Sequence, residues 1–340
     1  MVVESAEIIS QTGCRERIEM TATDDVALDY SIVIPVYFNE GCLTDTMASL
    51  KHDVIAQHPD LTCEVIFVDD GSGDGSLNEL LRIREKDPKI VKVIKLTRNF
   101  GQPRARLAGL SYARGKCVVA MSADGQDPAI LINEMFKAHF DEQFEIVVCT
   151  RQGRNESWYR ILTSKLFYAL MRRLSFPNMP PGGFDFVLLG RRALDVLLRN
   201  QEAHPFFQGQ ILWTGFKMKF IEYRRRARKV GRSRWTFGKK LTYLMDGVLS
   251  YSFFPMRLMS GMGILAALLG FLWALRIFVN FMVRGSSPVR GWSPLMIVIL
   301  VMGGLQMLML GIIGEYLWRT LAQVRNREPY IIETIYDDVG

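Results

Sequence analysis

EVIFVDDGSGDGS, residues 64–76, passes within a few positions from a continuous apolar run to a string of carboxylates, glycines and serines. A continuous apolar run is typical of a parallel strand that is buried on both faces, whereas a half-exposed strand would alternate. Gly, Asp and Ser favour turns at the end of such a strand. The stretch therefore predicts a buried strand at 64–68 followed by an acidic, glycine-rich loop.

Four more short apolar runs accompany this one, and helical patterns separate them. The predicted strands are 31–35, 64–68, 91–96, 117–121 and 145–149, and the predicted helices are 43–57, 76–86, 103–113 and 128–140. Strands that alternate with helices in this way form a layered α/β sheet with right-handed crossovers. The sequence therefore predicts an α/β fold with a mostly parallel sheet.

The composition is unusually apolar and basic for such a domain. Of the 340 residues 49% are hydrophobic, and the formal net charge is +7 at pH 7. A positive excess suits nucleic acid, anionic lipid or a phosphate-bearing ligand, and composition alone does not choose among them. The five cysteines show no CxxC spacing. Their number and spacing argue against a zinc site or a disulfide framework, and for a reducing compartment.

The two ends of the chain differ from the α/β zone. Residues 1–29 are polar and mixed in charge, without the apolar core of a signal peptide, and predict a disordered N-terminal extension. Residues 258–283 and 294–317 are long and apolar. Because about 20 residues at about 1.5 Å each cross a hydrocarbon core of about 30 Å, they predict a two-helix transmembrane hairpin over 258–318.

Basic residues give this hairpin an orientation. Lys and Arg are frequent at 217–240 before the pair and recur in the tail at 319–340, whereas the connecting loop carries only Arg284 and Arg290. By the positive-inside rule both termini lie in the cytoplasm. The second helix also contains Gln306 and several glycines, which permit helices to associate into a homo-oligomer.

Aromatic residues are interleaved with the charges in the basic zone before the hairpin. That mixture describes nucleic-acid surfaces and also membrane surfaces. Adjacency to apolar helices favours the membrane, so we expect no nucleic-acid partner. Residues 158–174 and 241–254 are amphipathic, which fits helices in the headgroup layer or ordinary surface helices. Residues 237–257 are predicted to form an interfacial segment beside the membrane.

Polar residues at the strand ends are the candidate ligand-binding groups, because ligands bind at the carboxyl ends of strands in an open α/β sheet. The loop after residue 68 does not fit a phosphate cradle, since Asp69, Asp70 and Asp74 would repel an anion and no GxGxxG or GxxxxGK[ST] is present. Its carboxylates suit hydrogen bonds to a base or a ribose. The alternative is a plain turn with a helix N-cap.

Asp124 and Gln126 follow the predicted strand at 117–121. A carboxylate at a strand end, with an oxygen ligand two residues on, can hold Mg²⁺ or Mn²⁺ against a diphosphate, although a capping role is again the alternative. Asp127 and Pro128 are typical of the N-cap and first position of a helix. We therefore expect Asp127 to cap the next helix.

These strand ends lie within longer motifs. The motifs are IVIPVYFNE (32–40), VIFVDDGSGDGS (65–76), LTRNFGQPRARLAGLSYARGKCVVAMSADGQDP (96–128), GGFDFVLLGRRAL (182–194) and RRRARKVGRSRW (224–235), followed by the helix hairpin. From about residue 31 to 327 the chain resembles family 2 glycosyltransferases of the GT-A fold. More narrowly, it resembles polyprenyl-phosphate glycosyltransferases of the dolichol-phosphate mannose synthase and bactoprenol glucosyltransferase type. The resemblance implies a Rossmann-like GT-A domain over residues 30–236.

The resemblance implies roles for individual residues on the donor side. It places Pro35, Tyr37, Glu40, Asp70 and Ser122 around the donor nucleotide, with Asp70 on the base or ribose. It makes Asp124 catalytic and assigns a divalent cation, Mg²⁺ or Mn²⁺, to Asp124 and Gln126. Family members usually show DxD followed by Gln, and here Ser122 replaces the first Asp of that motif.

On the acceptor side, Asp185 matches the family's acidic residue, as a base or as a positioning group. We favour positioning, because a phosphate monoester with a second pKa of about 6 is already largely ionised at neutral pH. The family often has Arg two residues later, where this chain has Val187. Contacts to the lipid phosphate or the donor diphosphate are assigned to Arg225, Arg228, Ser233 and Arg234.

The reaction that the resemblance implies is transfer of a sugar, with inversion, from a nucleotide sugar (a UDP-hexose) to a polyprenyl phosphate (undecaprenyl phosphate) for modification of cell-envelope glycans. The enzyme would be a multi-pass protein of the bacterial inner membrane with a cytoplasmic catalytic domain. Two alternatives stay open. One is a membrane glycosyltransferase with a different acceptor, and the other is a catalytically inactive membrane scaffold, to which Ser122 and Val187 point.

Overall fold

The apolar runs between residues 31 and 149 form strands, as their continuous hydrophobicity predicts. The computed structural model of the protein describes residues 28–151, 167–200, 202–203, 205–224, 237–284 and 292–337. The strands are β1 (Leu28–Val36), β2 (Cys63–Asp69), β3 (Val91–Leu96), β4 (Gly115–Ala120) and β5 (Ile146–Arg151). Most of the predicted N-terminal extension, residues 1–27, lies outside the described residues, and Leu28 and Asp29 already belong to β1.

The predicted helices between these strands are confirmed, with shifts at their ends. They are α2 (Leu43–Asp53) with the short 3₁₀ turn η1 (Ile55–Gln57), α3 (Ser76–Lys86), α4 (Gln102–Ser111), and α5 (Leu131–Phe136) with the π-helical turn η2 (Lys137–Asp141). The shift that matters is at α5, which begins at Leu131 rather than at Pro128. Asp127 therefore lies well before the helix.

Three further strands complete one eight-stranded sheet with the order β7-β5-β6-β4-β1-β2-β3-β8. They are β6 (Phe186–Gly190), β7 (Met218–Tyr223) and β8 (Ile332–Tyr336). β6 runs antiparallel to β4 and β5, β8 runs antiparallel to β3, and the other neighbours are parallel. The predicted mostly parallel α/β sheet is confirmed, whereas the sequence patterns do not predict these three strands.

β8 corrects the expectation of a separate tail at 319–340. The helix α11 (Trp292–Val324) extends into that range, and the chain then returns to pair with β3. Lys95 Nζ and Glu333 Oε1 are 2.6 Å apart across the two strands. The edge of β3 offers N–H and C=O groups to an extended chain, which gives the returning segment a partner. The α/β domain thus includes residues from beyond the helix pair, and not only 30–236.

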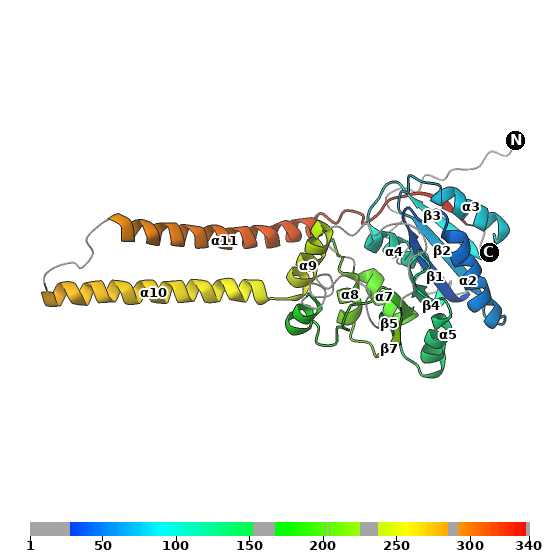
Figure 1. The fold of residues 1–340 in the computed structure, drawn as a ribbon, viewed down its shortest axis with the longest axis horizontal. Helices are drawn as coiled ribbons and strands as arrows, with labels where there is room; N and C mark the ends of the chain where they lie inside the picture. Colours follow the sequence, from blue (N-terminus) through cyan, green and yellow to red (C-terminus); the bar gives the residue numbers. More distant parts are fainter. Residues whose placement is uncertain are drawn as a thin grey trace.

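Helices cover both faces of the sheet, which explains the continuous apolar strands. α2, α3 and α5 pack on one face, where Leu80 and Phe136 are buried. α4, α7 (Arg191–Arg199) and α8 (Phe207–Trp213) pack on the other, where Leu194 is buried. This second layer lies on the side of the sheet toward the long helices (Figure 1).

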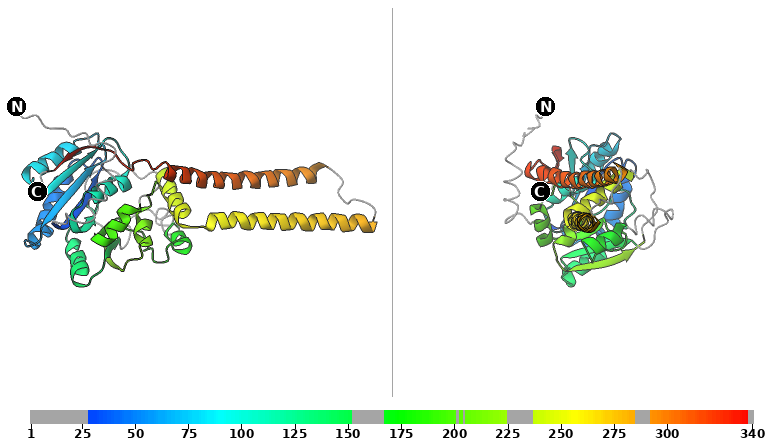
Figure 2. Two further views of the ribbon diagram at one scale, coloured as in Figure 1. Left: turned by 180° about the vertical axis from the view of Figure 1, so that it is seen from behind. Right: turned by 90° about the vertical axis from the view of Figure 1, so that its left-hand side faces the viewer.

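The helix α10 (Phe254–Arg284) and α11 extend side by side away from the α/β domain (Figures 1 and 2). By length and composition both can cross a membrane, over Phe254–Val279 and Val301–Val324. The apolar side chains of these stretches are not buried inside the protein. Both helices extend beyond the predicted limits of 258–283 and 294–317.

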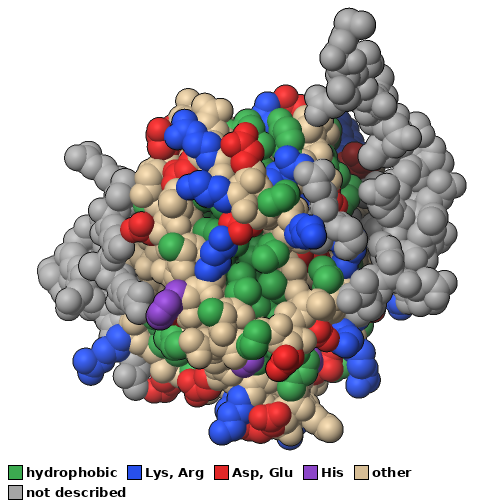
Figure 3. Space-filling model, turned by 90° about the vertical axis from the view of Figure 1, so that its right-hand side faces the viewer, with side chains coloured by type: hydrophobic (Ala, Val, Ile, Leu, Met, Phe, Trp, Pro, Cys, Tyr) green, Lys and Arg blue, Asp and Glu red, His purple; other side chains and the backbone are tan. Residues whose placement is uncertain are grey.

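Polar contacts attach the base of the helix pair to the α/β domain. The helix α9 (Phe237–Tyr251) precedes α10 and covers most of the segment predicted as amphipathic at 241–254. Arg319 of α11 and Asp246 of α9 form an ion pair of 2.9 Å, and the Ala203 N–H, between α7 and α8, donates to Gln323 Oε1 of α11 at 2.9 Å. Charged side chains of both signs are interspersed on the end of the domain remote from the helix pair (Figure 3), as on a water-exposed surface.

Candidate active site

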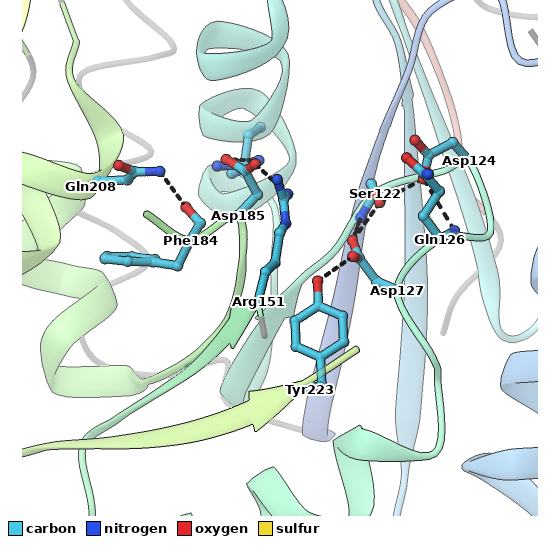
Figure 4. A network of polar contacts seen from close by, with 10 residues as sticks. Ser122, Asp124, Gln126, Asp127, Arg151, Phe184, Asp185, Gln208 and Tyr223 are labelled. Carbon is cyan, nitrogen blue, oxygen red and sulfur yellow. Dashed lines mark hydrogen bonds and ion pairs between the residues drawn. The ribbon is translucent and has the colours of Figure 1, made fainter. Parts of the chain in front are cut away.

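The carboxyl ends of β1, β2, β4, β5 and β7 meet at one edge of the sheet, as their parallel directions require. β6 runs the other way, so its beginning lies at this edge. Asp185 directly precedes β6 and therefore joins the residues that follow the other strands, as Figure 4 shows. The sheet thus brings together predicted site residues that are far apart in the sequence.

The loops that follow β1 and β2 are hydrogen-bonded to each other. The Phe38 N–H donates to Ser72 Oγ at 3.1 Å, and the Gly75 N–H donates to Glu40 Oε2 at 3.0 Å. A Cβ added at Gly75 would lie 2.2 Å from Glu40 Oε1, so a side chain at this position would displace the Glu40 carboxylate. Glu40, predicted beside the nucleotide, therefore also holds these two loops together.

Pro35 and Tyr37 differ in how far they can reach a ligand. Pro35 is buried within β1, paired with Val68 of β2, and so contributes the shape of the strand end. Tyr37 is half-buried at the strand end, with its ring 4.7 Å from that of Phe38 in an edge-on arrangement. Phe38 has a positive φ of 54°, which turns the chain sharply after Tyr37. Of the two, Tyr37 is the better placed to contact a nucleotide.

Asp70 holds the loop between β3 and α4. Its side chain is 2% exposed, and its two oxygens accept the N–H groups of Phe100 at 2.7 Å and Gly101 at 3.0 Å. Burial raises the pKa of Asp70 to about 6, although the two backbone N–H groups act in the opposite direction. Both oxygens retain lone pairs. The predicted contact with a base or ribose would therefore add to a structural role that the sequence does not predict.

Ser122 and Asp124 form a compact group at the end of β4. Asp124 is 5% exposed, and its Oδ1 accepts hydrogen bonds from Ser122 Oγ at 2.9 Å and from the Gln126 N–H at 3.2 Å. Ser122 Oγ also lies within hydrogen-bond distance of Asp127 Oδ2. Asp124 and Gln126, the two residues predicted to hold a cation, thus lie in one loop with Ser122 and Asp127, and hydrogen bonds connect the residues of this loop.

Asp127 does not cap α5, which corrects the sequence expectation. The N-cap position of α5 is Ile130, and no side chain caps the helix. Asp127 is 3% exposed and instead accepts a hydrogen bond from Tyr223 Oη, at the end of β7, at 2.6 Å. A local capping rule cannot foresee this partner, because the buried hydroxyl comes from a strand 96 residues away.

Asp185 lies between two arginines. Arg151, at the end of β5, donates to Asp185 Oδ2 at 2.8 Å, and Arg106 of α4 is 4.0 Å from Oδ1. Asp185 is 37% exposed, whereas Arg106 is 3% exposed and stacks on Phe207 at 4.3 Å. Burial alone would lower the pKa of Arg151, but the adjacent Asp185 carboxylate raises it, so the guanidinium stays charged. The Asp185 carboxylate, which is partly exposed to solvent, is therefore held by one buried and one half-buried cation.

Comparison with known proteins identifies the family. Residues 31–198 match the family described as Glycosyl transferase family 2. The protein described as uncharacterized glycosyltransferase YkcC of Bacillus subtilis (strain 168) is 36% identical over 310 residues, which cover 91% of this chain and 94% of that protein. The chain belongs to glycosyltransferase family 2. It is therefore an enzyme of the glycosyltransferase class, as its motifs predict.

A further relative and a solved structure are similar to this glycosyltransferase over different shares of the chain. The bactoprenol glucosyl transferase of Shigella phage SfII is 29% identical over 304 residues, which cover 89% of this chain and 97% of that protein. The solved structure of the mannosyltransferase PcManGT from Pyrobaculum calidifontis, in complex with GDP-Man and Mn²⁺, is 19% identical. The match covers 65% of this chain and 66% of the mannosyltransferase chain, with a TM-score of 0.44.

Sequence reasoning missed four residues of the glycosyltransferase site, namely Arg106, Asp127 as a buried acceptor, Arg151 and Tyr223. Arg151 and Tyr223 are each the last residue of a strand whose carboxyl end lies at the site edge. The strand-end rule applies to Arg151, just after the predicted strand at 145–149, and would have found Tyr223 if β7 had been predicted. Arg106 lies within a helix of small and polar residues, and the sequence gives no signal that its charge is buried.

Some predicted site residues of the glycosyltransferase are outside the described part of the chain. These are the four residues assigned to phosphate contacts, Arg225, Arg228, Ser233 and Arg234. The described chain reaches Arg224, directly after Tyr223, and resumes at Phe237. Of the predicted amphipathic segment at 158–174, residues 167–174 are described and are helical.

Proposed function

We propose that this glycosyltransferase transfers a hexose, with inversion, from a UDP-hexose to undecaprenyl phosphate at the cytoplasmic face of the bacterial inner membrane. The observation that carries the proposal is the coexistence, in one chain, of the strand-edge site and the apolar helix pair attached to it. The bactoprenol glucosyl transferase of phage SfII supports it, since it matches across both parts of the chain.

The proposed donor site is the part of the edge formed after β1, β2 and β4. Tyr37, Glu40 and Asp70 would surround the nucleotide, and Ser122 and Asp124 would face its diphosphate. The interlocked loops after β1 and β2 carry carboxylates rather than basic groups, which supports a base and ribose site there. Carboxylates suit the N–H and O–H donors of a nucleoside, and not its phosphates.

The 122–127 loop fits a divalent cation of the Mg²⁺ or Mn²⁺ type. Two carboxylates, Asp124 and Asp127, flank one Ser122 hydroxyl, which carries a single proton for both. Among the described residues no group of three His, Cys, Asp or Glu side chains could enclose an ion alone. Asp124 and the Gln126 amide would therefore hold the cation together with donor oxygens. When bound, it would neutralise charge that develops on the leaving diphosphate.

Asp185 would position the acceptor. In the proposed step an oxygen of the lipid phosphate attacks the anomeric carbon, and the bond from that carbon to the nucleoside diphosphate breaks. The phosphate needs no base, because it is largely ionised at neutral pH. Asp185 accepts a hydrogen bond from Arg151, so its carboxylate is fixed in place and can orient the acceptor or the sugar. Arg225, Arg228, Ser233 and Arg234 would contact the phosphates.

The helix pair would hold the site close to the lipid headgroup. α10 and α11 have the length and apolar composition of membrane-spanning helices, and the basic residues lie on the side of the α/β domain. With this orientation the catalytic domain and both termini are cytoplasmic. α9, at the base of the pair, would lie near the headgroup layer, where the lipid phosphate is found.

The test is transfer of radiolabelled sugar by the purified full-length protein in detergent or vesicles. A panel of UDP-hexoses is offered with undecaprenyl phosphate, with a glycolipid lacking phosphate, or with a peptide acceptor. We expect a lipid-linked product only with undecaprenyl phosphate. A product formed only on another acceptor would contradict the proposal.

A variant of the candidate site accompanies this assay. Asp124→Ala should abolish transfer, because it removes the carboxylate nearest the donor diphosphate and cation. Asp60→Ala, which changes an exposed carboxylate outside the site, is the matched control and should transfer at the wild-type rate. Full activity of Asp124→Ala would overturn the assignment of the site.

A further inference from the structure

A line of polar side chains crosses the site from the 122–127 loop toward Asp185. Ser122 Oγ lies within hydrogen-bond distance of Asp127 Oδ2, and Tyr223 Oη donates to Asp127 Oδ1 at 2.6 Å. Tyr223 and Arg151 are directly paired in β7 and β5, and Arg151 donates to Asp185 at 2.8 Å. Figure 4 shows Tyr223 between the two groups of side chains.

We infer that Tyr223 is a positioning residue, which orients the Asp124 carboxylate toward a bound cation by way of Asp127 and Ser122. The inference rests on the proposed function, because it concerns the donor and cation site of that reaction. Tyr223 and Asp127 are both buried, so neither needs to touch a substrate for this effect.

The orientation of Asp124 depends on which carboxylate receives the Ser122 hydroxyl proton. The Ser122 hydroxyl has one proton, but its oxygen is within hydrogen-bond distance of Asp127 Oδ2 and is 2.9 Å from Asp124 Oδ1. Only one of the two carboxylates can receive that proton at a time. Tyr223 supplies Asp127 with another proton, and the Ser122 N–H lies 3.4 Å from Asp127 Oδ2. With these donors on Asp127, the Ser122 proton is left to fix Asp124.

Tyr223 is suited to act as a permanent donor. Burial, followed by the nearby Asp127 carboxylate, raises the pKa of Tyr223, so the phenol keeps its proton throughout the neutral range. The ring is also packed independently of the hydroxyl, edge-on against Phe186 with 6.2 Å between the ring centroids. Phenylalanine at this position can therefore keep the packing while it removes only the donated hydrogen bond.

Without the Tyr223 hydroxyl, Asp127 would draw the Ser122 proton away from Asp124. Asp124 would then lose a donor that fixes its rotamer. Removal of groups that orient a metal ligand costs about 10- to 100-fold in metal affinity or activity. For Tyr223→Phe we therefore expect about tenfold weaker Mn²⁺ binding in the presence of UDP, and about tenfold lower kcat with little change in acceptor KM.

The experiment measures Mn²⁺ binding by electron paramagnetic resonance of free Mn²⁺ in the presence of UDP, together with kcat for sugar transfer. It compares wild type, Tyr223→Phe, Ser122→Ala and the double variant. If both residues act on Asp124 through one chain of bonds, the double variant loses no more than the worse single variant. Independent effects would instead multiply to about 100-fold.

Tyr330→Phe is the matched control, because it also removes a buried tyrosine hydroxyl with a side-chain partner. Tyr330 Oη lies 2.6 Å from Ser111 Oγ and belongs to the chain that leads into β8, not to the site. We expect wild-type Mn²⁺ binding and kcat for this variant. If the control loses as much as Tyr223→Phe, the effect is a general one of tyrosine removal and the inference is overturned.

Three further results would overturn the proposed role of Tyr223. Wild-type Mn²⁺ binding and kcat in a folded Tyr223→Phe, or multiplied losses in the double variant, would overturn the inference while transfer to undecaprenyl phosphate stands. If Tyr223→Phe does not fold, Ser122→Ala tests the same line of bonds from its other end, and wild-type Mn²⁺ binding there would overturn it. Failure of the proposed function itself appears separately, as absence of transfer by the wild type.

Discussion

The two halves of the candidate site hold their carboxylates in different ways. In the 122–127 loop, Asp124 and Asp127 receive hydrogen bonds from the hydroxyls of Ser122 and Tyr223 and from backbone N–H groups. Asp185 instead lies against the guanidinium groups of Arg151 and Arg106. Hydroxyl and amide donors orient a carboxylate but add no positive charge, whereas an arginine orients it and offsets its charge.

This difference separates two tasks. The 122–127 loop contributes two carboxylates, Asp124 and Asp127, and carboxylates suit a cation brought in with the donor diphosphate. The Asp185 half already contains its cations, Arg106 on α4 and Arg151 at the end of β5, and can receive an acceptor without an added ion. We therefore assign the cation to the first half and acceptor positioning to the second.

Removal of divalent cations should have the largest effect on the rate of sugar transfer. An unchanged rate would contradict most clearly the assignment of a cation to the 122–127 loop. With chelator we expect the transfer rate to fall by about 10³-fold or more, since a cation at the leaving diphosphate contributes several kcal/mol. Mg²⁺ or Mn²⁺ added in excess of the chelator should restore the rate. Full activity in chelator would show that the loop works without a cation.

A charge-removing variant of the other half should have a smaller effect. Asp185→Asn keeps the size of the side chain, and for a positioning residue we expect a 10- to 100-fold loss in kcat/KM, mainly through acceptor KM. Asp195→Asn, which breaks an Asp–Arg pair of 3.1 Å on the surface of α7, is the matched control with no expected loss. A loss confined to kcat that shrinks as pH rises would instead identify Asp185 as a base.

The sequence predicts some strands and helices of the fold better than others. β1 to β5 and the long helices follow from local patterns, because continuous apolar runs and helical periodicity need no knowledge of partners. β6 was not predicted, although the motif that contains Asp185 runs into it. β8 has the short, mixed sequence IETIY, which forms a strand only because the edge of β3 is there to pair with it.

The site was predicted residue by residue but not in its connections. Asp70 and Asp185 were identified, yet the partners that fix them lie in distant segments, at Gly101 and Arg151. Asp127 shows the limit most clearly. An Asp before a Pro has a strong local interpretation as a helix cap, and a tertiary hydrogen bond overrides it.

The smallest expected effect is on stability and concerns Asp70, which belongs neither to the 122–127 loop nor to the group around Asp185. Its buried carboxylate should make the stability of the protein depend on pH. Its pKa is about 6 in the folded protein against an ordinary 3.8, so between these values the folded state binds more protons than the unfolded state. Stability should therefore fall as pH rises from about 4 through about 6, by roughly 2 to 3 kcal/mol. Thermal unfolding at pH 4.5 to 7 should show this slope in wild type and lack it in Asp70→Asn. Equal slopes would contradict the assignment.

The division of the site is tested most directly by titrating Mn²⁺, with UDP present, into Asp124→Asn and Asp185→Asn and following free Mn²⁺ by electron paramagnetic resonance. Each variant replaces one carboxylate by an amide of the same size. The account predicts that Asp124→Asn loses Mn²⁺ binding and that Asp185→Asn binds Mn²⁺ as tightly as wild type. Retained binding in Asp124→Asn, or loss of binding in Asp185→Asn, would contradict it.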